Sequence, residues 1–410
     1  MTMTHRRRLV FVVAILLMVV SIFFDAQQVY GQDGIAVEDA AAAVNFGKSI
    51  TFTAKIQSPI PIQQASLLFR GVNEEATRVE PLLPAADGSV SFTYDASQNL
   101  FPPFSRIEFW FQATLAGGQT YTSEPITFPY NDDRFPWREA ALANVTVHWY
   151  AGGDAFGAAA MDAAGSGMLA MNEFIPVSLS APLDVYIYSN VNDLQSALLS
   201  DGQGWAGGHA DPMAGVILTA IAPGENQSIE LETKIPHELA HVILYRALGE
   251  KYDLQPAWLL EGIASMMELY PNPEYVRALD AAGGNDSLIP FEELCASFPA
   301  DAGRAFLAYA QSRSFVTYIR DTHGVSGLTR LMETYGDGVA CEPGATKAIG
   351  ASLAQLDAGW RESVLGQNAA GVAFRNLLPF IVLMLVVLLV PIWNAIDLLR
   401  HGRKHGLKSK

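Results

Sequence analysis

The chain has 410 residues, of which 50% are hydrophobic, and this is enough apolar surface for two domains with separate cores. Acidic residues outnumber basic residues by 42 to 26, which gives a formal net charge of -16. This balance argues against nucleic acid as a partner, because a surface that binds phosphates needs an excess of Lys and Arg. It is typical of a soluble, exposed body.

The two cysteines, Cys295 and Cys341, are too few for a disulfide scaffold and do not have metal-ligand spacing. In an oxidising compartment they would form one bridge. The alternative is that they remain two unpaired, buried thiols. The residues themselves leave both readings open.

The N-terminus reads as an export signal. Arg6, Arg7 and Arg8 precede residues 9–24, an apolar run that contains Ser21 as its one polar residue. This order is typical of a secretory signal peptide, and we predict that it occupies residues 1–31. The apolar run is nearly long enough to remain as an anchor, so cleavage is left open. Either outcome exports the chain that follows.

Residues 32–130 show short alternating segments separated by turn residues. The segments are 49–56, 65–70, 90–94, 106–113 and 119–123. Strands at this spacing predict an antiparallel β-sandwich of immunoglobulin-like type. No cluster of catalytic side chains occurs in this part of the sequence, so we expect a packing or spacer module.

A linker over residues 131–137 leads into a second predicted domain. Strands are expected at 145–150 and 184–188, and helices at 155–174 and 191–199. A glycine-rich loop at 204–208 then leads to an apolar run, residues 214–218. That run is either an edge strand able to pair with an extended peptide or an internal strand. His209, in the same loop, is expected to be solvated.

An HExxH motif, formed by His237, Glu238 and His241, is the first feature of the sequence that indicates a metal site. In a helix, residues i and i+4 lie on one face, so both imidazoles can bind one metal ion. Glu238 beside them can take a proton from a water molecule at that metal. Pro236 suits the first turn of such a helix, where its missing N–H costs nothing.

The third ligand is expected to be Glu261, twenty residues after His241. That separation fits a helix, a reversal and a second antiparallel helix, which together would bring the carboxylate to the metal. The alternative is a carboxylate on a solvated helix face. The apolar neighbours Trp258, Leu259 and Ile263 argue for burial, and a buried carboxylate needs a partner.

Residues 291–365 read as a helical bundle, with helices expected at 302–319, 326–335 and 353–364. Tyr309 is a candidate to donate its hydroxyl to the oxyanion that forms during hydrolysis. It could equally be a core aromatic on its helix, and both readings stay open.

Residues 377–393 are almost wholly apolar and long enough to span a bilayer, which predicts a transmembrane helix over 374–396. Trp393 sits where an interfacial aromatic is expected. The basic tail, residues 397–410, marks the cytoplasmic side by the positive-inside rule. We therefore expect a single-pass protein of the cell membrane whose body is extracytoplasmic.

The HExxH motif and the WLxEGxA sequence that begins at Trp258 together resemble the gluzincin metallopeptidases. More specifically, the chain resembles the bacterial peptidase MA-like family, over residues 135–364. The resemblance implies zinc bound by His237, His241 and Glu261, and Glu238 as the general base. Tyr309 is carried over to the catalytic set.

The predicted fold class is therefore α+β. An immunoglobulin-like β-sandwich over 32–130 is followed by a thermolysin-like, gluzincin-type peptidase domain over 131–368, whose C-terminal part is helical. The transmembrane helix and the basic tail complete the chain.

The predicted function is that of a membrane-anchored, extracytoplasmic zinc metallopeptidase that hydrolyses peptide or protein substrates. A zinc-bound water would attack the scissile carbonyl with Glu238 as general base. No motif for holding a free amino terminus is found, which favours an endopeptidase. The alternative is a catalytically silent surface binding or adhesion protein on a peptidase fold, and the intact Glu238 counts against it. The sequence does not determine the oligomeric state.

Overall fold

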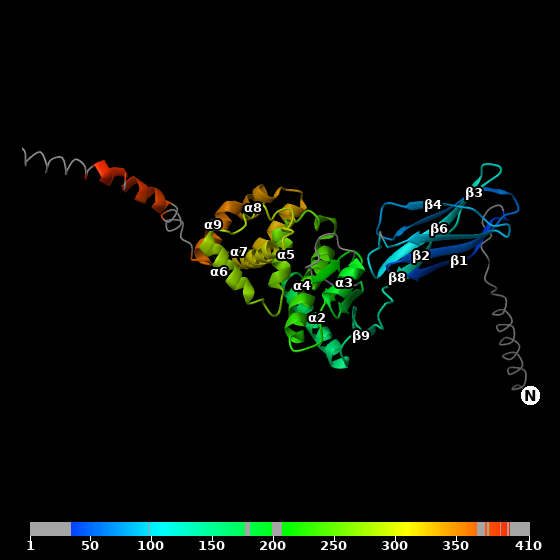
Figure 1. Cartoon of the computed structure of the whole chain (residues 1–410), viewed down its shortest axis with the longest axis horizontal. Coiled ribbons are helices and arrows are strands. Elements are labelled where there is room, and N and C mark those ends of the chain that lie inside the picture. Colours follow the sequence, from blue (N-terminus) through cyan, green and yellow to red (C-terminus); the bar gives the residue numbers. More distant parts are fainter. Residues whose placement is uncertain are drawn as a thin grey trace, which may run out of the picture. The chain divides into compact units, whose positions relative to one another are not determined.

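The computed structural model describes residues 34–97, 99–176, 181–198, 207–366, 374, 377–385, 387–391 and 393. The predicted signal segment, 1–31, and the predicted basic tail, 397–410, lie outside these residues. The chain divides into two compact units, one up to Arg134 and one from Phe135 onward (Figure 1). The boundary expected from the sequence, between residues 130 and 131, lies four residues before this division.

The first unit consists of antiparallel strands in two sheets. One sheet has the order β1-β2-β5, and the other has the order β4-β3-β6-β7, with β8 also pairing with β6. The strands are β1 (Ala36–Asn45), β2 (Ser49–Gln57), β3 (Ile62–Gly71), β4 (Arg78–Leu82), β5 (Ser89–Asp95), β6 (Ser105–Leu115), β7 (Thr120–Thr122) and β8 (Ile126–Tyr130).

Aromatic side chains fill the space between these two sheets. The ring of Phe52 on β2 lies 5.0 Å from that of Phe69 on β3 and 5.2 Å from that of Phe109 on β6. All three side chains are fully buried, so the two sheets pack face to face. The immunoglobulin-like type stays a prediction.

The second unit begins with a mixed sheet whose described strands have the order β12-β13-β11-β10-β9. The strands are β9 (Arg138–Leu142), β10 (Val145–Trp149), β11 (Leu183–Tyr188), β12 (Gly208–Asp211) and β13 (Val216–Ala220). β10, β11 and β13 run parallel, while β9 and β12 are antiparallel to their neighbours.

The edge-strand alternative for residues 214–218 is wrong. That run contributes to β13, which is internal because β12 pairs with its outer side, and all five residues of β13 are buried. The edge is β12 instead, a strand of four residues whose first two, Gly208 and His209, were expected in a loop. Its strand conformation comes from its pairing with β13.

Up to residue 363, the described α-helices of the second unit are α2 (Asp154–Phe174), α3 (Val191–Leu198), α4 (Gln227–Leu248), α5 (Ala257–Met266), α6 (Glu274–Asn285), α7 (Ala302–Gly336), α8 (Cys341–Ile349) and α9 (Leu353–Ser363). α7 contains a break at Gly324, whose φ is 71° and ψ 173°. The two helices expected at 302–319 and 326–335 lie on either side of that break. The described chain is thus a mixed α/β structure with a helical C-terminal part.

The helical part has an aromatic core that fixes α5. The ring of Phe315 on α7 lies 5.2 Å from Trp258 at the start of α5 and stacks at 3.9 Å on Phe291. Trp360 on α9 closes the cluster, 5.5 Å from Phe291. Each of these four side chains is fully buried. Burial of this much aromatic surface holds α5 against α7.

Cys295 and Cys341 form a disulfide, with their Cα atoms 6.1 Å apart. Of the two alternatives left open by the sequence, the bridge is the one found. It lies beside the first turn of α5: the backbone N–H of Ala257 donates to the carbonyl of Cys295, and the indole N–H of Trp258 lies 3.4 Å from Sγ of Cys341. The bridge therefore ties α8 to the Cys295 segment, which bonds to the first turn of α5, the helix that carries Glu261.

The predicted transmembrane segment, 374–396, includes positions outside the described residues. Residues 377–385 and 387–391 within it are helical. Their large apolar side chains are exposed almost throughout, as is that of Trp393. Within the described residues, the structure contains no helix with both the length and the apolar character needed to cross a membrane.

A candidate metal centre

α4 presents His237 and His241 on one face, because the two residues are separated by one helical turn. The helix begins ten residues before the first histidine, at Gln227, so the expectation that Pro236 lies in its first turn is wrong. The helix extends further because Leu231 and Ile235 are buried in the core. Packing of this kind outweighs the cost of a proline inside a helix.

Because Pro236 lacks an N–H, α4 forms a hydrogen bond with the segment that contains Leu269. A proline has no N–H, so the carbonyl four residues earlier, that of Glu232, lacks its helical donor. That carbonyl accepts a hydrogen bond from the backbone N–H of Leu269 instead, at 2.9 Å. The residue before Leu269 is Glu268, so this bond fixes the chain where Glu268 approaches the motif helix.

Glu261 comes from α5, which follows α4 after a reversal that includes a short 3-10 helix, Gly249–Lys251. Gly262 allows α5 to lie close to α7, because a Cβ atom there would be 2.6 Å from the carbonyl oxygen of Ser312. The helix, reversal and second helix expected from the sequence are thus present. They bring Glu261 against both histidines.

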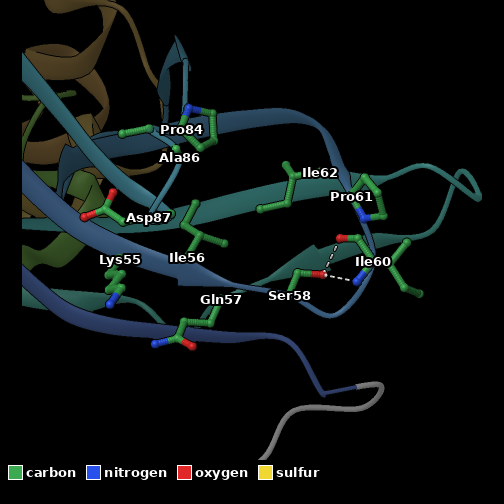
Figure 2. A pocket seen from close by; sticks show the side chains of 12 residues that line it. Lys55, Ile56, Gln57, Ser58, Ile60, Pro61, Ile62, Pro84, Ala86 and Asp87 are labelled. Atoms are coloured by element: carbon green, nitrogen blue, oxygen red, sulfur yellow. Dashed lines mark hydrogen bonds between the residues drawn. The ribbon is translucent and has the colours of Figure 1, made fainter.

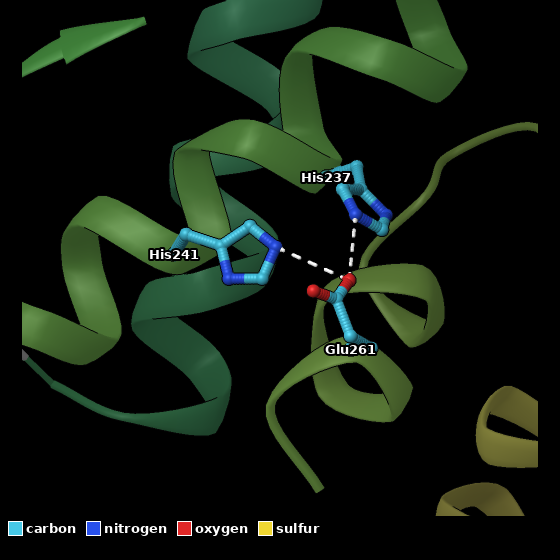
Figure 3. A group of neighbouring side chains, drawn as sticks. All are labelled: His237, His241 and Glu261. Carbon is cyan, nitrogen blue, oxygen red and sulfur yellow. Dashed lines mark ion pairs between the residues drawn. The ribbon is translucent and has the colours of Figure 1, made fainter. Parts of the chain in front are cut away.

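Figure 3 shows the three side chains converging from the two helices. Oε2 of Glu261 lies 3.4 Å from Nε2 of His237 and 3.5 Å from Nε2 of His241. One ligand atom from each residue lies within 4.8 Å of the other two. Among the described residues, this is the group of His, Cys, Asp or Glu side chains that could hold a metal ion.

The surroundings of the Glu261 carboxylate indicate whether a metal ion fits this site. Oε2 of Glu261 is buried and makes no hydrogen bond to any described residue. A buried, ionised oxygen without a donor is costly unless a cation balances it. Two imidazole nitrogens and one carboxylate oxygen are a donor set that zinc prefers, and they leave a coordination position free. The residues present therefore fit a zinc ion.

The electrostatics of the centre favour a positive charge between the ligands. Burial lowers the pKa of His237, but the adjacent carboxylates of Glu261 and Glu268 outweigh burial and raise it to about 10. Burial raises the pKa of Glu261, but the adjacent imidazoles outweigh burial and hold that pKa below its usual range. The raised pKa of His237 shows that the site stabilises a positive charge, and the lowered pKa of Glu261 shows that its carboxylate stays ionised.

Each histidine also contacts a side chain on the side away from Glu261. Nδ1 of His237 lies 3.3 Å from Oε1 of Glu268, and Nδ1 of His241 lies 3.0 Å from the hydroxyl of Tyr252. The side chain of Glu268 is 2% exposed. These contacts leave both Nε2 atoms facing the centre. The HExxH motif does not predict either partner.

A cavity of about 240 Å³ opens over the three ligands. Its further lining residues are Gly208, His209, Ala210, Pro212, Glu238, Tyr252 and Tyr309. The edge strand β12 therefore forms one wall of the cavity. His209, expected in a solvated loop, belongs to this strand and faces the same cavity.

Tyr309 on α7 also lines this cavity. Its ring lies 5.9 Å from that of His237 and packs at 4.9 Å against Phe298. Burial and the charges of Glu261 and Glu238 raise its pKa above the ordinary value, so the hydroxyl keeps its proton at neutral pH. The position suits a hydrogen-bond donor to a bound carbonyl, and that role stays a prediction.

A second hollow, in the β-sandwich unit, is shown in Figure 2. It has a volume of about 470 Å³, and its charged lining residues are Lys55 and Asp87. The carboxylate of Asp87 accepts hydrogen bonds from the backbone and hydroxyl of Ser89. Among the residues that line this hollow, we find no paired acid and base and no metal-ligand set.

Comparison with known proteins identifies the domain that carries the metal centre. Residues 163–366 match the model of the Peptidase MA superfamily. The match covers the whole of α4, α5 and α7, so it includes His237, Glu238, His241, Glu261 and Tyr309. This part of the chain is therefore a peptidase-like domain. The β-sandwich lies outside the match, and no curated protein matches the chain.

Several solved structures show a limited likeness. A carbohydrate-binding module of family 56 that binds β-1,3-glucan is 18% identical, over 23% of this chain and 98% of the module, with a TM-score of 0.17. OgpA from Akkermansia muciniphila, solved with an O-glycopeptide substrate as a catalytically inactive form, is 16% identical over 26% of this chain and 32% of its own, with a TM-score of 0.19. TM-scores this low do not support an inference about fold or function.

Proposed function

We propose that this protein is a gluzincin-type zinc metallopeptidase that acts as an endopeptidase on peptide or protein substrates outside the cytoplasm. The single observation that carries the proposal is the convergence of His237, His241 and Glu261 on a buried carboxylate oxygen that lacks a hydrogen-bond donor. The Peptidase MA match over the same residues supports it.

The three ligands would hold the zinc ion, with Glu268 and Tyr252 keeping the imidazoles in place. When bound, zinc supplies a positive charge that polarises the scissile carbonyl and acidifies water.

Glu238 and Tyr309 both line the cavity, from which their side chains act on the reacting atoms. The carboxylate of Glu238 takes a proton from the attacking water and passes it to the amine that leaves. The hydroxyl of Tyr309 donates a hydrogen bond to the oxygen on which negative charge develops. Water adds across the peptide bond, which yields one carboxylate and one amine.

The location we propose is the outer face of a cell membrane, with the peptidase domain extracytoplasmic and a short C-terminal tail in the cytoplasm. The basic and apolar N-terminus, the exposed apolar side chains among residues 377–385, 387–391 and 393, and the disulfide all support it. A chain ended after residue 366 should then be released from the membrane fraction. Retention of that shorter chain in the membrane, once its N-terminal signal segment has been cleaved, would contradict anchoring by the C-terminus.

The test of the activity is a digest of a broad peptide library by the parent protein and by Glu238→Gln. We expect the variant to keep its zinc and to lose cleavage by on the order of 10²- to 10⁴-fold, because its amide cannot accept the proton. Glu230→Gln, in a surface ion pair with Lys234 on the same helix, is the control and should cleave as the parent does.

Two outcomes would count against the proposal. If Glu238→Gln cleaves as well as the parent, Glu238 is not the base. If the parent binds zinc in full but cleaves no peptide in the library, a binding or adhesion role on a peptidase fold is favoured over an enzyme.

A further inference from the structure

Gly208, the first residue of the edge strand β12, lies directly against Glu238 on the motif helix. An ideal Cβ atom at Gly208 would lie 2.9 Å from Cδ and 3.2 Å from Cγ of Glu238, and closer still to Oε1. Carbon atoms that do not bond pack at about 3.5–4.0 Å. No side chain therefore fits at position 208 while the Glu238 carboxylate keeps its place.

Backbone conformation does not explain the glycine. Gly208 does not have a positive φ, so other residues can adopt its conformation. Position 208 is also paired normally in the sheet, opposite Thr219 of β13. Space explains the glycine instead, because the carboxylate of Glu238 occupies the volume that a side chain at position 208 would need.

The strand is held more firmly than the carboxylate. The carbonyl of Gly207 accepts hydrogen bonds from the backbone N–H of Ala220 and from the hydroxyl of Thr219, at 2.9 and 3.1 Å. Glu238, in contrast, meets position 208 with the free end of a flexible side chain. An added methyl group at 208 should therefore displace the carboxylate and leave the strand in place.

We propose that Gly208 is a positioning residue for Glu238: its missing side chain lets the carboxylate rest against the backbone of β12, next to the metal centre. The structure alone supports the contact between Gly208 and Glu238, whereas its effect on catalysis rests on the proposed peptidase function. A side chain at 208 would move the base and leave His237, His241 and Glu261 where they are.

The direct test is a crystal structure of the Gly208→Ala protein compared with the parent. We expect the Glu238 carboxylate to be displaced from position 208, while β12 keeps its pairing with β13. A structure in which the carboxylate stays and the strand moves away would overturn the proposal. This readout does not depend on peptide cleavage.

Gly207→Ala is the matched control. A Cβ atom at Gly207 would make ordinary contacts with Lys234, at 3.5 Å from Nζ and 3.6 Å from Cε. The two variants add the same methyl group at adjacent positions, and we expect Gly207→Ala to leave Glu238 and the activity unchanged. If Gly207→Ala loses as much activity as Gly208→Ala, the effect belongs to the strand rather than to Glu238.

Kinetics give the second readout. We expect Gly208→Ala to lower kcat by about 10- to 100-fold with KM changed less than about 2-fold, because a displacement near 1 Å is enough to misalign a base. Zinc content should equal that of the parent. A kcat equal to that of the parent, or a loss of zinc that accounts for the lost activity, would overturn the proposal.

A double variant separates positioning from a general structural defect. Glu238→Asp shortens the side chain by one methylene group and withdraws it from position 208. In that background we expect Gly208→Ala to cost less than about 2-fold in kcat, since the two changes act through one contact. Costs that multiply independently would overturn the proposal. If the parent cleaves nothing, the proposed function fails, and the crystal structures alone decide the role of Gly208.

Discussion

Nδ1 of His237 lies 3.3 Å from Oε1 of Glu268, a carboxylate that is buried beneath the metal centre and lies outside the HExxH motif. A carboxylate in this position orients the imidazole and makes it a stronger ligand. It also adds negative charge close to the place where we propose that a cation binds. The contact should therefore contribute to metal affinity rather than to the chemical step.

We expect Glu268→Gln to weaken zinc binding by about 10- to 100-fold, the usual cost of removing such a partner. Competition with a chromophoric chelator would measure the affinity. Glu274→Gln is the control, because Glu274 is an exposed carboxylate on α6, paired with Arg277. Equal zinc affinity in the parent and Glu268→Gln would show that the contact does not support the metal.

Pro236→Ala should disturb the contact between His237 and Glu268, although Pro236 does not take part in it. Alanine restores a backbone N–H that can donate to the carbonyl of Glu232, in competition with the N–H of Leu269. We expect the Leu269 amide to exchange its hydrogen faster and zinc affinity to fall, even though alanine favours helix more than proline does. Hydrogen exchange at Leu269 is the decisive measurement, and unchanged protection there would contradict this view of the proline.

Tyr309→Phe should lower kcat by about 10- to 100-fold while KM and zinc content stay close to those of the parent. The hydroxyl would act on charge that develops in the transition state, so its loss affects the rate and not the binding. Tyr318→Phe, on the same helix but away from the cavity, is the control. An unchanged kcat in Tyr309→Phe would assign that ring to packing alone.

Loss of the Cys295–Cys341 bridge should destabilise the second unit. The two residues are separated by 46 positions, and a loop of that length predicts a loss of about 4 kcal/mol in the chain-entropy model. Denaturant unfolding of the Cys295→Ser, Cys341→Ser double variant, compared with the parent with and without reductant, would measure it. Mass analysis of the unreduced parent that found two free thiols would contradict the bridge.

Much of the β-sandwich could be predicted from local alternation. β6 was expected at 106–113 and spans Ser105–Leu115, because inward residues such as Phe109 alternate with outward ones such as Glu108. β1 was missed, since Ala36–Asn45 consists largely of alanines and acidic residues without that alternation. Its strand conformation depends on its pairing with β2, a tertiary contact that local sequence does not carry.

The candidate site could also be predicted only in part. His237, Glu238 and His241 follow from helical spacing, and Glu261 from its distance along the chain and its apolar neighbours. Glu268 and Tyr252 reach the histidines only through the fold, so no local pattern marks them. The four-residue strand β12 lacks an apolar pattern for the same reason, and with it the contact of Gly208 was not foreseen.

The central claim is that His237, His241 and Glu261 bind one zinc ion, and the most direct test is the zinc content of the purified parent protein and of Glu261→Ala. We expect about one zinc ion per chain in the parent and a large loss in the variant, which keeps only two of the three ligands. A parent without zinc, or a Glu261→Ala protein that retains as much zinc as the parent, would contradict the claim.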